Sequence, residues 1–370
     1  MRLAFTPEQS DLRAAVRELC RDHAADTDLR RVADLPGGFD PKVYDQVAGM
    51  GLLGLAVPEF FGGAGCGWVE VGVVLEEFGR ALLPVPYFSS AVLAVAALLA
   101  CDDPGAHADY LPRIVDGSLL ATVGLTGTTA TWEGAGVTVT ARPGDRDWIL
   151  HGEMSYVCDG AGADLLLVFA RSPEGGGLFA VDAPASGIRR EALQVVDLTR
   201  PQAHIVLDDV PARLIGQISP SWRPFARVLD IAATALAAES LGGAQRTLEM
   251  AVDHAKIRKQ FGRPIGSFQA IKHLCADVLV RVESARSAAY YALHATGVGG
   301  EVGATAASLA KAHCGDAFLY AAEQNVLVHG AIGLSWEHSA QLYLKRAKTT
   351  AVMFGDATHH REQLAQRIGL

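Results

Sequence analysis

The side chains that could do chemistry are scattered along this chain. Its six cysteines have neither CxxC spacing nor a histidine at ligand spacing, which argues against a zinc site and a disulfide framework. They are Cys20, Cys66, Cys101, Cys158, Cys275 and Cys314. The histidines His254, His273, His329 and His338 likewise have no cysteine or carboxylate at metal-ligand spacing. We therefore predict no metal site, and spacing alone names no catalytic reaction.

One carboxylate has a setting that could change its chemistry. Glu239 lies inside the apolar stretch 237–240, which is typical of a long helix. A carboxylate there could act as a general base, or it could be half of a structural ion pair. We favour the ion pair.

The charge and hydropathy of the chain exclude two kinds of partner. Lysine and arginine total 32 and aspartate and glutamate total 41, so the formal net charge is -9, and no basic block is present. This argues against nucleic acid. The most apolar run, residues 91–100, is far shorter than the roughly 20 residues of a membrane span, and the N-terminus has charged residues instead of a signal core. We expect a cytoplasmic protein with no membrane partner.

The elements that must position any site change in type along the chain. Thr6-Pro7-Glu8-Gln9 combines a helix N-cap, a first-turn proline and a capping-box partner, and helical patterns continue to about residue 115. From about Leu119 to Pro211, short β-branched runs alternate with turn residues. Long helical segments return from about Trp222.

This order predicts an α+β fold of three parts. We expect an N-terminal helical domain over 1–115, a middle antiparallel β domain over 116–213 and a C-terminal helical bundle over 214–370.

The specific signal is the string from Arg258 to Gln269, which reads RKQFGRPIGSFQ. Its first two residues could simply offset the carboxyl-end dipole of the preceding helix. The whole string, however, closely resembles the RxxFGxxI…FQ motif of the acyl-CoA dehydrogenases. Residues 244–246 (AQR), 330–337 (GAIGLSWE) and 344–348 (LKRAK) are similar to further segments of that family. The resemblance covers essentially the whole chain.

The resemblance implies an FAD cofactor and an acyl-CoA substrate. In that family a carboxylate removes the α-proton of the thioester while a hydride leaves the β-carbon for N5 of FAD. The usual base follows the RDAK segment by six residues, where this chain has Phe354. A minority of the family carries the base on an earlier helix in a D-x-E-R string, and here Ala232 and Ala233 replace its Glu and its substrate-binding Arg. Neither position supplies a base, and Glu239 is the displaced candidate.

The residues that would hold the chain's own flavin also depart from the family. Asp356 stands where the family has a Thr beside the flavin diphosphate, and its charge would repel phosphate, although it is equally explained as a helix N-cap. Residues 126–129 (TGTT) replace the TEPGAGSD segment, and residues 156–158 (YVC) replace WIT or WIS. We predict that the chain's own flavin site has been lost.

The resemblance implies that a second flavin-facing surface is retained. In this family it reaches across a dimer interface to a neighbour's FAD. Arg258 would grip the diphosphate, Gln260 and Phe261 would lie against the adenosine half, and the backbone at Gly330 allows close approach. Gln269 ends the same string and is assigned to the same surface.

The pattern therefore resembles two-subunit acyl-CoA dehydrogenases, in which one polypeptide carries the base and the other completes the flavin site. The match has gaps, because Leu327 replaces an expected Gln and Ala331 the second Gly of a pair. The resemblance implies a homologous partner subunit encoded nearby, a bulky acyl-CoA substrate such as a sterol side-chain fragment, and an electron-accepting flavoprotein. Two alternatives stay open: a homo-oligomer that uses Glu239, and a non-catalytic scaffold.

Overall fold

The computed structural model describes residues 5–145 and 147–370, which form two compact units interleaved along the sequence. The helical unit contains the residues up to Arg30, Trp68–Leu83 and Ala233–Leu370. The sheet unit contains Arg31–Gly67 and Pro84–Ala232. These two units are defined by packing contacts. The three domains inferred from the sequence, 1–115, 116–213 and 214–370, were defined by secondary-structure type, so the two divisions are not equivalent and the three domains stay a prediction.

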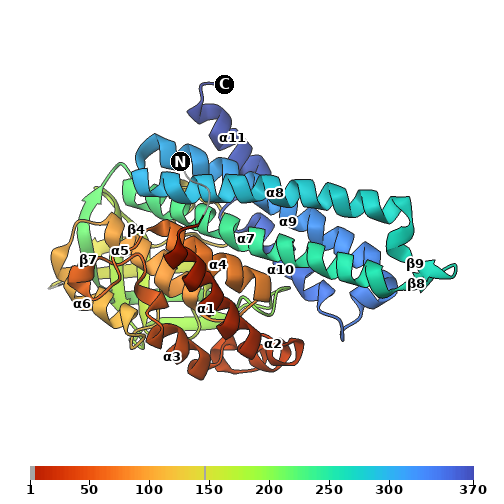
Figure 1. Ribbon diagram of the computed structural model, residues 1–370. Coiled ribbons are helices and arrows are strands. Elements are labelled where there is room, and N and C mark those ends of the chain that lie inside the picture. Colours follow the sequence, from red (N-terminus) through yellow and green to blue (C-terminus); the bar gives the residue numbers. More distant parts are fainter. Residues whose placement is uncertain (1–4, 146) are drawn as a thin grey trace. The chain divides into compact units, whose positions relative to one another are not determined.

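The sheet unit is built on a seven-stranded sheet (Figure 1). Its strands are β1 (Ala121–Gly124), β2 (Thr140–Pro143), β3 (Trp148–Cys158), β4 (Leu165–Ser172), β5 (Gly175–Asp182), β6 (Ile188–Ala192) and β7 (Gln202–Ser219). Strands β4, β2, β3, β7 and β5 pair in that order, and β5 pairs back onto β4, so the sheet closes on itself. Most pairings are antiparallel, as the sequence predicts, but β1 and β2 each pair with β4 in parallel.

Strand β7 extends further than the sequence indicated. The β region was expected to end near Pro211, yet β7 continues to Ser219. It pairs with β3 as far as Ala212 and with β5 from Arg213 onward. A proline lacks the N–H that a ladder needs, and here it lies beside the point where the strand changes partner, so the loss is tolerated.

Short helices complete the sheet unit. They are η1 (Pro36–Gly38), α3 (Pro41–Gly49), η2 (Leu52–Gly54), η3 (Glu59–Phe61), the π-helical η4 (Phe88–Ala94), α5 (Val95–Ala100), α6 (Pro104–Val115) and η5 (Gly134–Gly136). The apolar run 91–100 lies in η4 and α5, where its side chains are mostly buried. Within the described residues, no helix has the length and apolar character needed to cross a membrane.

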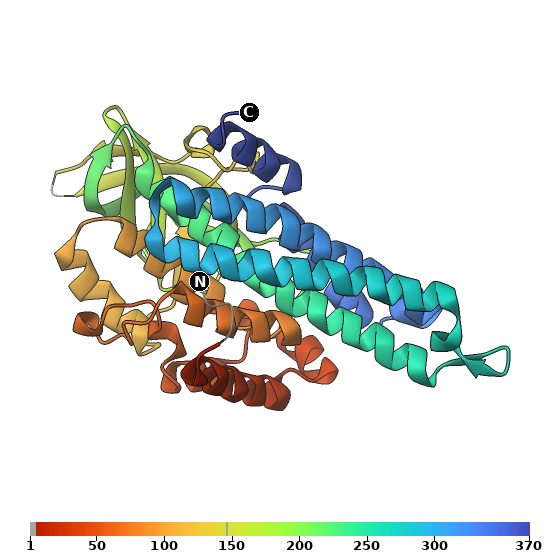
Figure 2. The same cartoon turned by 45° about the horizontal axis from the view of Figure 1, so that its top comes forward.

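The helical unit consists of long helices and one hairpin. Two helices, α2 (Asp26–Ala33) and α7 (Arg223–Ile257), begin in one unit and end in the other. The remaining elements are α1 (Pro7–His23), α4 (Trp68–Ala81), β8 (Lys259–Gln260), β9 (Arg263–Pro264), η6 (Ile265–Ser267), α8 (Gln269–Val298), α9 (Gly300–His329), η7 (Gly330–Leu334), α10 (Ala340–Val352) and α11 (Ala357–Arg367). Figures 1 and 2 show α7, α8 and α9 side by side, with the β8–β9 hairpin projecting from one end.

Local sequence explains how these helices start and how closely they pack. The predicted capping box is present, since Thr6 Oγ1 accepts from Gln9 N and Gln9 Oε1 accepts from Thr6 N. A Cβ on Gly79 of α4 would lie 2.1 Å from the carbonyl oxygen of Glu239, and a Cβ on Gly242 of α7 would lie 1.8 Å from that of Glu76. Neither position has room for a side chain, so glycine allows the backbones of α4 and α7 to approach closely.

Candidate functional site

The string that carries the family resemblance folds as a tight hairpin beyond α7. Strands β8 and β9 pair, and the turn residues Phe261 and Gly262 have φ of 52° and 79°. Two residues in the left-handed region are what a two-residue hairpin turn requires. Phe261 adopts this unfavourable conformation with 91% of its surface exposed, so neither backbone preference nor burial favours an aromatic residue there. A binding role accounts for it better than a structural one.

Arg258 joins α7 to this hairpin. Its N–H donates to the carbonyl of His254 at 2.9 Å, and its own carbonyl accepts from the N–H of Ile265 at 2.8 Å. The backbone is therefore fixed, whereas the side chain is exposed. An exposed guanidinium on a fixed backbone suits bidentate contact with a diphosphate.

Phe268 ties the hairpin to α8. Its ring lies edge-on to that of Phe261, with centroids 6.1 Å apart, and the guanidinium of Arg263 lies 4.2 Å from its centroid. Gln269, the first residue of α8, is exposed, and its Nε2 lies 3.4 Å from His273 Nε2. Arg258, Phe261 and Gln269 of the string are thus exposed.

A small apolar core brings this string and Gly330 to the same end of the bundle. Its members come from α7, α9, η6 and the start of α8: Ala251, Ala255, Val328, Ile265, Ile271 and Leu274. Gly330 follows α9 with φ of 68°, and a Cβ there would meet no atom within 4 Å. The backbone conformation explains this glycine, and its surface is open to a ligand.

Three histidines form a stack at this end, which the sequence reasoning missed. The ring centroid of His329 lies 4.2 Å from that of His254 and 4.5 Å from that of His338. Burial lowers the pKa of His254, and the charges of His329, Arg258 and His338 lower it further. Arg258 is therefore within electrostatic range of the stack. In the sequence, the position of His329 directly before Gly330 could have indicated that a histidine lies at this end of the bundle.

Large apolar side chains are exposed on the same segments. Between 53% and 91% of the surface of each is accessible in Ile257, Phe261, Leu327, Ile332, Leu334 and Trp336. Such a concentration marks an interaction surface. We call the exposed residues of 257–269 and 327–336 the bundle-end surface.

The sheet positions that depart from the family's flavin motifs are engaged with their own loops. Thr126 Oγ1 donates to the carbonyl of Thr131 at 2.9 Å, and the Tyr156 hydroxyl donates to the carbonyl of Thr128 at 3.2 Å. Cys158 is only 3% exposed and has a weakly donating thiol in place of a hydroxyl. The hydroxyls of Thr126 and Tyr156 are therefore bonded within this chain, whereas Arg258 and Gly330 are exposed at the bundle end.

Phe354, at the first base position, is buried in the connection between α10 and α11. It is 3% exposed with φ of 56°, and its phenyl ring cannot take a proton. Lys311 Nζ holds the connection by donating to the carbonyls of Gly355 at 2.9 Å and Ala351 at 3.3 Å. Asp356 Oδ1 accepts from the N–H of His359 at 2.8 Å, so it is the N-cap of α11.

Burial alters the titration of the basic groups around this connection. It lowers the pKa of Lys311 to about 8. Burial, followed by the charge of Lys311, lowers the pKa of His360 to about 3, and His360 Nε2 lies 3.0 Å from the carbonyl of Phe354. The side chains of Lys311 and His360, both basic residues, therefore contact residues 354–355 through the backbone carbonyls.

The second base position holds small apolar residues, because Ala232 and Ala233 are 0% and 1% exposed within α7. Further along α7, Glu239 is buried, and its Oε1 accepts a hydrogen bond from Arg346 Nη1 at 2.6 Å. This is the ion pair that the apolar setting of Glu239 favoured. Its partner lies in the LKRAK segment, which the sequence had singled out for another reason.

The structure thus separates the predicted residues into two groups. Arg258, Gln260, Phe261, Gln269 and Gly330 lie at the bundle end and are exposed. The base positions, Phe354 and Ala232, and the displaced candidate Glu239 are buried. Among the residues with described placement, no three His, Cys, Asp or Glu side chains are arranged to hold a metal ion.

Family models match both ends of the chain. The acyl-CoA dehydrogenase N-terminal domain matches residues 6–118, and the acyl-CoA dehydrogenase C-terminal domain matches residues 222–369. The acyl-CoA dehydrogenase IpdE2 of Mycobacterium tuberculosis is 31% identical over 93% of this chain and 92% of its own length. FadE34 of the same organism is 36% identical over 92% of this chain, but the match covers only 45% of FadE34.

Two solved structures are also similar. A variant of the Tcur3481-Tcur3483 steroid ACAD superposes with a TM-score of 0.88 and 34% identity, covering 98% of each chain. The ChsE4-ChsE5 complex from Mycobacterium tuberculosis superposes with a TM-score of 0.91 and 28% identity, covering 100% of this chain and 99% of the other.

Proposed function

Because the chain belongs to the acyl-CoA dehydrogenase family, a family of FAD-dependent oxidoreductases, we propose that it is the base-lacking subunit of a heteromeric acyl-CoA dehydrogenase. The observation that carries this proposal is the buried Phe354 at the position of the base, combined with an exposed Arg258 hairpin. The partner supplies the carboxylate that removes the α-proton of the acyl-CoA. FAD, when bound, accepts the hydride from the β-carbon.

In this proposal the bundle-end surface completes the partner's flavin site. Arg258 binds the diphosphate, and Gln260 and Phe261 lie against the adenosine half. Gln269 contributes a neutral hydrogen-bonding group, and the open surface at Gly330 lets the ligand approach the backbone. Burial of Phe261 on assembly would also account for an aromatic residue that is 91% exposed in this chain.

Two comparisons support a heteromeric assembly. The names of both similar structures give two polypeptides, Tcur3481 with Tcur3483 and ChsE4 with ChsE5. The unmatched part of FadE34 is longer than the matched part, so that protein has room for a second unit of this size on one chain. Since the first of these structures is named as a steroid enzyme, we propose a bulky, sterol-derived acyl-CoA as the substrate, with a second flavoprotein as electron acceptor.

The displaced-base alternative loses support from the Glu239 geometry. Its carboxylate is 4% exposed and is paired with Arg346, which is 3% exposed. Using Glu239 as a base would protonate it and remove the negative charge that pairs with the buried guanidinium of Arg346. The scaffold alternative predicts that neither FAD nor acyl-CoA binds, and the following experiment separates it from the proposal.

The chain is purified alone and after co-expression with the homologue encoded nearby. FAD per complex is measured by absorbance after gel filtration, and desaturation of acyl-CoA is measured with an artificial electron acceptor. We expect flavin and activity only in the mixture. Flavin with activity in the chain alone would support the homo-oligomer, and flavin-free protein in both preparations would support the scaffold.

A further inference from the structure

A cavity of about 520 Å³ opens in the helical unit among α1, α4, α7 and α8. It shares no residue with the bundle-end surface. Four arginines line it, Arg13, Arg17, Arg80 and Arg286, together with the aromatic rings of Phe5 and Tyr290. Its volume is within the roughly 300 to 1,000 Å³ of small-molecule sites.

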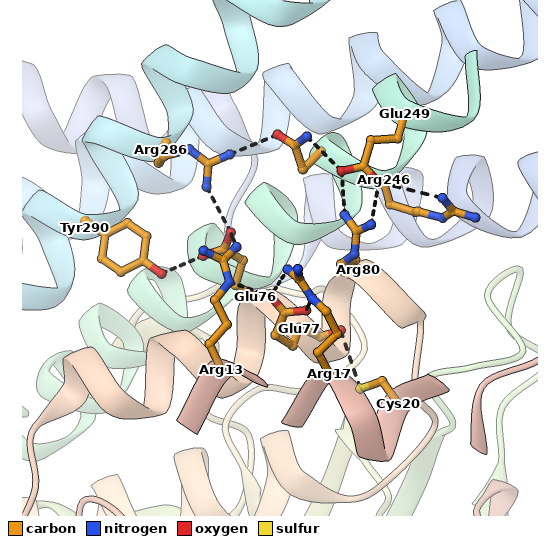
Figure 3. A network of polar contacts seen from close by, with 11 residues as sticks. Arg13, Arg17, Cys20, Glu76, Glu77, Arg80, Arg246, Glu249, Arg286 and Tyr290 are labelled. Carbon is orange, nitrogen blue, oxygen red and sulfur yellow. Dashed lines mark hydrogen bonds and ion pairs between the residues drawn. The ribbon is translucent and has the colours of Figure 1, made fainter. Parts of the chain in front are cut away.

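Two buried glutamates fix three of these arginines (Figure 3). Glu77 Oε1 accepts from Arg13 Nε and from Arg17 Nη2, both at 2.7 Å. Glu76 Oε1 accepts from Arg13 Nη2 at 2.7 Å and from Arg286 Nη1 at 3.0 Å. Glu76 is only 2% exposed and Glu77 only 1%. These buried carboxylates fix the positions of the three guanidiniums and hold them close to one another.

Glu77 stays charged in this setting. Burial acts to raise the pKa of Glu77, but the hydrogen bonds from Arg17 and Arg13 outweigh it, so the pKa lies below its usual range. Arg13 and Arg17 each use Nε and Nη2 for the glutamates. The Nη1 group of each has no acceptor within the described part of the chain, and the side chain of Arg17 is 50% exposed.

Gln245 of the AQR segment, which the proposed function leaves without a role, also lines the cavity. Gln245 accepts from Arg286 Nη2 at 2.9 Å and donates to Glu249 Oε1 at 3.0 Å. Glu249 also pairs with Arg80 and Arg246. The cavity lining contains four arginines and two glutamates, Glu249 and Glu283, and the side chain of Glu283 lies 3.4 Å from Arg286 Nε and is 55% exposed. With the buried Glu76 and Glu77 included, arginines and carboxylates are equal in number here, whereas the whole chain has a net charge of -9.

Aromatic rings give the cavity an apolar side. The Phe5 and Tyr290 rings meet edge to face with centroids 5.1 Å apart, and the guanidinium of Arg13 lies 5.2 Å from the Phe5 centroid. The Tyr290 hydroxyl donates to Glu76 Oε2 at 2.5 Å, which fixes this ring as well. Anchored guanidiniums beside fixed rings match a ligand that has phosphates at one end and a flat ring at the other.

We propose that this cavity binds a nucleoside diphosphate, with Nη1 of Arg13 and Arg17 on the phosphate oxygens and the base against Phe5 and Tyr290. Such a site is distinct from the flavin surface, and it does not depend on the function proposed above. A guanidinium pair with preset geometry binds phosphate with little loss of side-chain freedom.

The test is titration calorimetry of the full-length chain, alone and with its partner subunit, with ADP and inorganic pyrophosphate as probes. We expect ADP to bind more tightly than pyrophosphate, because only ADP contacts the rings. Arg17→Gln should weaken ADP binding by at least about tenfold. Arg21→Gln, the matched control one turn further along α1, should leave the affinity within about twofold, since Arg21 does not line this cavity.

Two further variants keep the test decisive. Ser287→Glu places a negative charge on the cavity wall without removing any arginine–glutamate pair, so it should also weaken ADP binding by at least about tenfold. Arg258→Ala should have no effect on this site. The proposal fails if the wild-type chain does not bind ADP, if Arg17→Gln and Ser287→Glu bind it normally, or if only Arg258→Ala abolishes binding. The last result would assign ADP to the flavin surface.

Discussion

Two regions of the helical unit carry the family's motifs, and they differ in how much of the motif they keep. At the bundle end, the RxxFG string is intact, and its side chains face solvent. In the α10–α11 connection, the position that the sequence assigns to the base holds Phe354, which is buried. Its carbonyl lies 3.0 Å from His360 Nε2, and the carbonyl of Gly355 accepts from Lys311 Nζ. An exposed surface gains nothing for folding from Arg258 or Phe261, so a partner is the better reason for both.

The largest expected effect concerns the buried region. Phe354→Glu should not make the isolated chain active, because the sheet residues still do not fit a flavin and a new carboxylate would be desolvated there. The unsubstituted isolated chain lacks a base, and that lack alone costs on the order of 100- to 10,000-fold in rate. Acyl-CoA turnover by the purified variant is compared with that of the co-purified complex. If the purified Phe354→Glu variant were active within about tenfold of the complex, the isolated chain would need only a base. The proposed contrast between the bundle-end surface and the α10–α11 connection would then be wrong.

The Glu239–Arg346 pair tests whether the buried region is purely structural. Arg346→Met should lower the free energy of unfolding by about 3 to 5 kcal/mol, since it removes the ion pair made by a buried carboxylate. Urea denaturation of the isolated chain measures this. Glu239→Gln together with Arg346→Met should recover part of the loss, because the double variant buries no unpaired charge. A single variant as stable as the wild type would show that Glu239 is neutral or solvated and would reopen its role as a base.

Arg258 tests the exposed region. Arg258→Ala in the co-expressed complex should reduce FAD occupancy, by roughly 1.5 to 3 kcal/mol for each charge-assisted bond lost, with the fold intact. Arg258→Lys should recover only part of it, because an ammonium lacks the planar fork. Absorbance at the flavin band after gel filtration gives the occupancy.

Asp356→Thr is the matched control for that measurement, since Asp356 caps α11 and is assigned to the chain's own lost site. It should leave FAD occupancy unchanged. Full FAD occupancy in Arg258→Ala would show that the bundle-end surface does not contribute to FAD binding. It would favour the alternative of a non-catalytic scaffold.

The smallest effect is a pH dependence of stability that originates at His360. Its pKa is about 3 in the folded chain, whereas an unfolded histidine titrates near 6.5. Between these values the unfolded chain binds a proton that the folded chain does not, so stability falls as the pH is lowered, by up to about 1.4 kcal/mol per pH unit. Urea unfolding between about pH 7 and pH 5 should show a shallower slope for His360→Asn. Parallel slopes would contradict the assignment.

Much of this molecule follows from local sequence. The start of α1 at Thr6 and Gln9 and the order of helical and strand regions depend on neighbouring residues, so local patterns predict them. The residue types at 258, 330 and 354 were likewise readable from the string to which each belongs. The course of β7 past Pro211 was not, because a change of strand partner leaves no local pattern.

The sequence by itself determined the family and the order of the elements, and it predicted that Phe354 and Ala232 occupy the two base positions. The tertiary structure alone decided which distant charges meet. Glu239 pairs with Arg346, Arg13 joins Glu76 to Glu77, and His254 stacks on His329. Such contacts depend on how helices pack, and packing is set by close approaches such as that of Gly242 in α7 to the backbone of α4, which no sequence period reveals.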